Sequence, residues 1–85
     1  MYVHVQQHAV DRWREYVGPM AVRSIAKTVR RHLAAALKSG INIDITGAGH
    51  IQIKPTVWAV VKPEPIGWIV ITFHQGINYA QRGTE

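Results

Sequence analysis

Cysteine is absent from this chain of 85 residues. Without thiols the protein has no disulfide, no thiolate nucleophile, no cysteine-ligated zinc and no thiol redox chemistry. The chain also lacks any apolar run near the roughly 20 residues that a membrane-spanning helix needs. Its first residues have neither a charged start nor an apolar run, so no signal peptide is predicted. We therefore expect a cytoplasmic protein that does not bind membranes.

Acidic residues are scarce, with five Asp and Glu against ten Lys and Arg and a formal net charge of +5. None occurs between Glu15 and Asp44. Either this basic interval is a solvated helix face, or its positive field attracts a polyanion such as nucleic acid. The basic side chains of the predicted second helix are Arg23, Lys27, Arg30, Arg31 and Lys38.

The length predicts one domain, residues 1–85, and 47% apolar residues supply one core with little to spare. A functional site is then expected on the surface or in a shallow groove. Residues 2–6 alternate as a short strand, and a helix begins at Gln7 with an inner stripe containing Trp13. Gly18 and Pro19 separate it from a second helix that is expected to end at Ser39. Its expected inner stripe is Val22, Ile25, Ala26, Val29, Leu33, Ala36 and Leu37.

After Gly40 the apolar period changes from helical spacing to two. One hairpin is predicted over residues 41–54, with its alternating isoleucines facing the helices, and a second over residues 57–74. The tail, residues 75–85, is expected to fray. The prediction is an α+β domain with two helices on one antiparallel sheet of four or five strands, in the order β-α-α-β-β-β-β.

His8 and Arg12 form the first candidate site, because residues four apart are neighbours on a helix. Histidine transfers protons near neutral pH and arginine binds phosphate, so the pair suits phosphodiester cleavage. Alternatively, His8 is a capping or solvated residue and Arg12 pairs with Asp11 or Glu15.

Thr72 and His74 form the second candidate site, at the end of the last predicted strand. Alternation predicts that Trp68 and Val70 share their face. A phosphate site is completed by a lysine on an adjoining strand, with Lys54 and Lys62 as the candidates. The alternative is a solvated histidine beside a threonine that favours β-structure.

The chain contains five histidines but no His-Glu-x-x-His run, so neither a metal site nor a cofactor is expected. His4 and His8 lie on either side of a predicted strand-to-helix junction, so their spacing does not place them on one helix face. His32 flanks the apolar stripe of the second helix and is expected at the edge of the core.

The segments His8-Ala9-x-x-Arg12 and Val70-Ile71-Thr72-Phe73-His74, with a basic second helix between them, resemble the small RelE/BrnT-like toxins. That group shares the ribonuclease fold of barnase and the colicin nuclease domains. The resemblance implies a metal-independent ribonuclease, often paired with an acidic antitoxin. It also implies His8, Arg12 and Thr72 as site residues, with His74 beside them.

The expected function is therefore RNA cleavage by general acid and base catalysis. His8 or His74 transfers protons, and Arg12 with Lys54 or Lys62 binds the phosphate. Two alternatives stay open. In the first, the basic helix belongs to a nucleic-acid-binding domain without catalysis. In the second, the chain is a phage or mobile-element module that binds an acidic protein.

Overall fold

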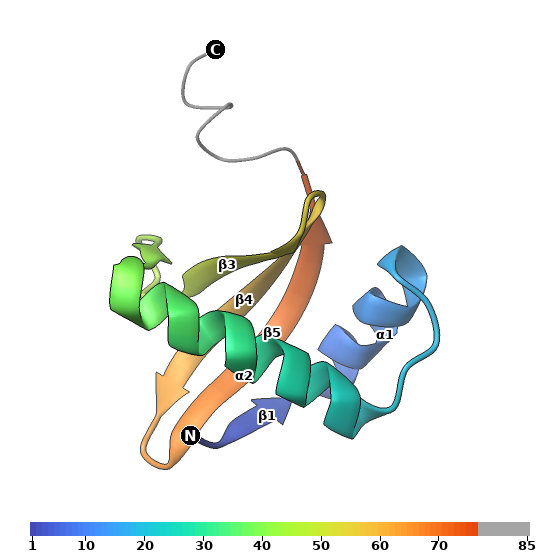
Figure 1. Ribbon diagram of the computed structural model, residues 1–85, viewed down its shortest axis with the longest axis horizontal. Coiled ribbons are helices and arrows are strands. Elements are labelled where there is room, and N and C mark those ends of the chain that lie inside the picture. The colour runs from blue at the N-terminus through green and yellow to red at the C-terminus, as the bar shows by residue number, and fades with distance from the viewer. Residues whose placement is uncertain (77–85) are drawn as a thin grey trace.

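A computed structural model describes residues 1–76 of the chain (Figure 1). The elements follow the predicted order β-α-α-β-β-β-β and confirm the α+β fold class. They are β1 (Val3–Val5), α1 (Gln7–Tyr16), α2 (Val22–Ser39), β2 (Asn42–Ile43), β3 (Gly49–Lys54), β4 (Val57–Glu64) and β5 (Gly67–Gln75).

The five strands form one sheet in the order β1-β5-β4-β3-β2. Strands β2 to β5 pair antiparallel, as the predicted hairpins require. β1 differs, because it lies parallel to β5 with Val3 opposite Trp68. The contact is close: Trp68 N donates to Tyr2 O at 2.9 Å, and a Cβ on Gly67 would collide with that carbonyl. The sheet is therefore mostly antiparallel, with one parallel pair at its edge.

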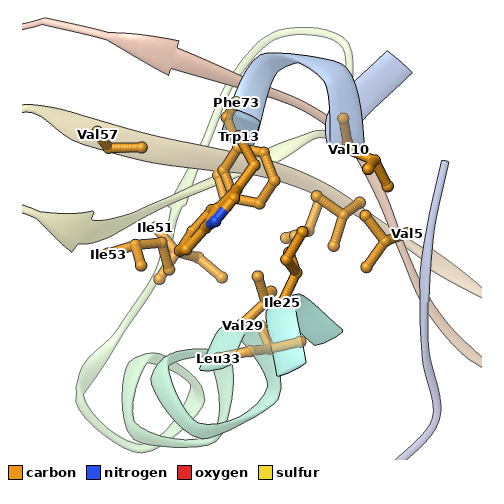
Figure 2. Packing of buried hydrophobic residues seen from close by; sticks show 14 residues of the cluster. Val5, Val10, Trp13, Ile25, Val29, Leu33, Ile51, Ile53, Val57 and Phe73 are labelled. Carbon is orange, nitrogen blue, oxygen red and sulfur yellow. The ribbon is translucent and has the colours of Figure 1, made fainter. Parts of the chain in front are cut away.

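Both helices contribute to one apolar core against the sheet, and Figure 1 shows α2 crossing the sheet obliquely. α2 buries Ile25, Val29 and Leu33 at the four-residue spacing of an inner helix stripe. α1 buries Trp13, whose ring meets Phe73 of β5 edge-on, with centroids 5.1 Å apart (Figure 2). The opposite face of the sheet carries no helix of residues 1–76, and in this sense alone, for the described residues, we call it the uncovered face.

Two details of the second helix differ from the prediction. It begins at Val22 rather than Pro19, after Gly18 with φ 138° and an extended Ala21. Val22 and Leu37 were expected on the inner stripe but are each 44% exposed. They lie in the first and last turns of an 18-residue helix. This helix is about 27 Å long, and its two ends extend beyond the core.

The first predicted hairpin is only partly correct. Ile51 and Ile53 are buried in the core, but Ile43 is 53% exposed and Ile45 is fully exposed. The cause is the length of β2, which pairs over only two residues before the chain turns at Asp44. Beyond that point the alternation of the isoleucines no longer corresponds to a strand.

The predicted faces of the last strand are wrong in part. Val70 and Phe73, three residues apart, are both buried in the same core, and Trp68 packs against it. An irregularity in the pairing with β4 explains this, because Val61 lies opposite Val70 while Val60 lies opposite Thr72. The extra residue is a β-bulge. Thr72 and His74 consequently face away from Trp68 and Val70.

The predicted fraying of residues 75–85 concerns mainly residues 77–85, which lie outside the described residues. Gln75 ends β5, and Gly76 N donates to Thr56 O at 3.0 Å. Neither helix of residues 1–76 is long and apolar enough to cross a bilayer.

Candidate active site

Polar and aromatic side chains gather on the uncovered face, where three strands lie side by side. Cross-strand pairing aligns His50 of β3, Val60 of β4 and Thr72 of β5 in one row. The next row consists of Gln52, Trp58 and His74. The two histidines therefore stand on strands that are separated by β4.

Asp44 closes the turn between β2 and β3 with its side chain. Its Oδ1 accepts from Thr46 N at 2.8 Å, Thr46 Oγ1 at 2.6 Å and Ala48 N at 3.1 Å. Its Oδ2 lies 2.7 Å from Nε2 of His50. The hydroxyl of Thr46 and the ring of His50 stabilise the charged carboxylate and hold the pKa of Asp44 well below its usual range, with the two backbone amides adding to the effect.

His50 lies between Asp44 and His74. Because an ionised carboxylate only accepts hydrogen bonds, Nε2 of His50 carries the proton that Asp44 accepts. In the neutral ring Nδ1 is then an acceptor, and it lies 3.4 Å from Nε2 of His74. The carboxylate thus sets the tautomer of His50, and this tautomer orients the contact between the rings.

Trp58 of β4 lies directly opposite His74 of β5 in the strand pairing. The planes of the two rings are nearly parallel, at 7°, and their centroids lie 6.5 Å apart. Trp58 is only 5% exposed although it is outside the core cluster on the helix side of the sheet. Trp58 and His74 are thus neighbouring aromatic rings on the face opposite the helices.

Asp44, His50 and His74 make a continuous chain of a carboxylate and two imidazoles, with 2.7 Å and 3.4 Å between their polar atoms. Such a chain moves a proton between the rings while the carboxylate stabilises the cation that forms. A ligand set of three His, Asp or Glu side chains suited to a metal ion does not occur within residues 1–76.

His8 and Arg12 lie on α1, in the layer of helices, whereas Thr72 and His74 lie on the uncovered face. The structure does not bring the two predicted pairs to one surface. His8 is exposed. Arg12 forms an ion pair with Glu15 at 2.6 Å, and this partner raises the pKa of the guanidinium.

The predicted lysines occupy different positions. Lys62 lies on the uncovered face, two residues beyond Val60 on β4 and opposite Ile69 of β5. Lys54 is exposed at the end of β3, where the pairing with β4 is irregular. The hydroxyl of Thr72 donates to Phe73 O at 3.2 Å. Lys62 and Thr72 are thus the predicted phosphate-binding residues that share the face of the histidine pair.

The basic residues of α2 separate into two groups. Arg23, Lys27 and Arg30 line a groove beside the start of β1, whereas Arg31 and Lys38 are exposed outside it. This groove is on the helix side of the molecule and is separate from the histidine pair.

Asp44, His50 and Trp58 were not among the residues predicted for the site. The alternation of Ile51 and Ile53 places His50 on the outer face of its hairpin, which is a usable signal. Its proximity to His74, 24 residues further along, depends on the strand order and on the bulge in β5.

We expect the stability contributed by Asp44 to depend on pH. Its folded-state pKa is depressed, so the contribution is complete above the unfolded value of about 4 and is lost as the pH falls toward the folded value. Asp44→Asn keeps an oxygen that accepts from the turn amides but removes the charge. The difference in Tm between wild type and this variant should be largest near neutral pH and shrink below about pH 4.

Thermal unfolding followed by circular dichroism from about pH 7 to pH 3 measures this difference. Asp11→Asn removes the same charge from α1 and controls for net charge. A difference for Asp44→Asn that stays constant across the range would contradict the assigned role of the carboxylate.

Comparison of the chain with models of protein families, with characterised proteins and with solved structures found no match. The observed architecture, two helices against a mostly antiparallel five-stranded sheet, is compatible with the fold that the resemblance to RelE-like toxins implies.

Proposed function

We propose that the protein is a metal-independent RNA endonuclease of the RelE-like toxin type, with its site on the uncovered face of the sheet. The observation that supports this most directly is the chain from Asp44 through His50 to His74. Paired imidazoles oriented by a carboxylate transfer protons near neutral pH without a metal ion. The excess of positive charge favours an anionic substrate.

In the proposed reaction the ring of His74 accepts the proton of a ribose 2′-hydroxyl. Its Nε2 proton moves to Nδ1 of His50, and Asp44 stabilises the resulting imidazolium. The 2′-oxygen attacks phosphorus, the bond from phosphorus to the 5′-oxygen breaks, and the reverse transfer returns a proton to that oxygen. The products are a 2′,3′-cyclic phosphate and a 5′-hydroxyl.

Lys62 and Thr72 are proposed to contact the phosphate, since both are on the face that carries the histidines. A cation and a hydroxyl stabilise the negative charge that grows on the phosphoryl oxygens. His8 and Arg12, which the family resemblance implicates, lie on the other layer and are not needed for this mechanism. The same resemblance makes an acidic antitoxin the expected protein partner.

Incubation of the purified protein with end-labelled single-stranded RNA in EDTA tests the proposal. We expect fragments that end in a 2′,3′-cyclic phosphate, identified by mass spectrometry. Binding without cleavage, also in the presence of ribosomes, would contradict the proposal and favour a nucleic-acid-binding domain. Absence of RNA binding together with salt-sensitive capture of an acidic protein would favour a protein-interaction module.

A further inference from the structure

A basic groove lies between the first half of α2 and the start of β1, two elements that run close together (Figure 1). Its volume is about 400 Å³, and its walls are formed by Met1, Tyr2, Val3, Arg23, Ala26, Lys27 and Arg30. A groove of this size accommodates part of a flexible polymer or a small molecule.

The cations of the groove form a row on one side of the helix. Arg23, Lys27 and Arg30 follow a spacing of four and three residues and spread over about 10 Å of the helix axis. The lining contains no carboxylate. Within residues 1–76 none of the three cations forms an ion pair. Their charge is therefore available to an anion from outside.

Tyr2 adds an aromatic side chain to the wall of the groove, and it is 53% exposed. Its backbone is held by the hydrogen bond from Trp68 N and by the close approach of Gly67. Nucleic-acid bases stack on exposed aromatic rings. The side chains of an acidic peptide such as polyglutamate have no flat ring that could stack on Tyr2. The combination favours a single-stranded nucleic acid.

From these contacts we infer that the α2–β1 groove binds single-stranded nucleic acid through three phosphate contacts and one base stacked on Tyr2. The inference goes beyond the proposed cleavage, because binding here requires neither His50 nor His74. It also separates Arg30 from its neighbour Arg31, which carries the same charge on the same helix but does not line the groove.

The experiment measures the binding of a fluorescent single-stranded DNA oligonucleotide at several salt concentrations. A deoxy strand lacks the 2′-hydroxyl, so binding is observed whether or not the protein cleaves RNA. Each phosphate contact contributes about 0.7 to the slope of log K against log salt. We expect a wild-type slope of about −2, a slope reduced by about 0.7 in Arg30→Gln, and no change in Arg31→Gln.

Tyr2→Ala should weaken binding roughly tenfold without changing the slope, because stacking involves no counterion release. Circular dichroism confirms that each variant is folded. Equal slope changes in Arg30→Gln and Arg31→Gln would overturn the inference, since a diffuse field then explains binding. The inference would also be overturned if the wild-type protein bound a polyglutamate peptide but did not bind the oligonucleotide.

Discussion

Replacement of His74 by alanine is expected to lower the rate of RNA cleavage by about 10²- to 10⁴-fold, the usual contribution of a general acid or base. His74 is the ring proposed to exchange protons with the substrate. It lies nearly parallel to the ring of Trp58, and its Nε2 is 3.4 Å from Nδ1 of His50. Loss of the ring removes proton transfer, but the variant keeps every lysine and arginine of the protein. Initial rates on a labelled RNA measure the effect, and filter binding should show nearly unchanged affinity.

His50→Ala should reduce cleavage to a similar extent, because His50 accepts the proton from His74. Residues that act as one unit give non-additive losses. The double variant is therefore expected to be no slower than the slower of the two single variants. Losses that multiply would show that the two rings act independently and would contradict the relay from Asp44 to His74.

His8→Ala distinguishes this assignment from the one that the family resemblance implies. Its side chain is exposed on α1, away from the uncovered face. If His8→Ala abolished cleavage and His50→Ala did not, the site would lie on the helix layer. His32→Gln is the matched histidine control, since His32 contacts only Thr28 O of its own helix among the polar contacts of the described residues, at 2.9 Å.

Trp13→Ala is expected to cost about 3 to 5 kcal/mol of folding free energy, the range for truncating a buried aromatic side chain. Trp13 is 1% exposed and joins α1 to β5 through Phe73 (Figure 2). A domain of this length has a total stability of only about 4 to 13 kcal/mol. The loss therefore removes a large part of the stability, and we expect a much lower midpoint in urea denaturation.

Trp13→Phe is the matched variant for this prediction. It keeps an aromatic ring against Phe73 and removes an indole N–H that is buried without a hydrogen-bond partner in the described part of the chain. We expect a cost clearly below that of Trp13→Ala, because the phenylalanine ring leaves a smaller cavity. A small effect of Trp13→Ala, comparable to that of the phenylalanine variant, would show that α1 is not anchored through this contact.

Most elements of the fold were predictable because their signals are local. The spacing of Ile25, Val29 and Leu33 predicts a helix with one buried stripe, and Gly18 marks the break before it. Period-two alternation predicts the strands with Ile51 and Ile53 on the core side. The pattern failed at Ile45, where a turn fixed by the side chain of Asp44 ends the alternation.

The candidate site could be predicted only in part. His74 and Thr72 were predicted because both stand near the end of a strand, and Lys62 because it lies on an adjoining strand. His50 was not, because a histidine on a hairpin has no local signal for a partner on another strand. Nor does the sequence show that His8 and His74 are on different layers.

The sequence by itself determined the type and order of the elements, since helix and strand periodicity depend on residues close together in the chain. Only the tertiary structure decided that β1 lies parallel to β5 and that a bulge turns Thr72 and His74 toward the uncovered face. It also decided that His74 meets His50 across β4. These contacts depend on strand order and register, which are set by packing of the whole core rather than by any local pattern.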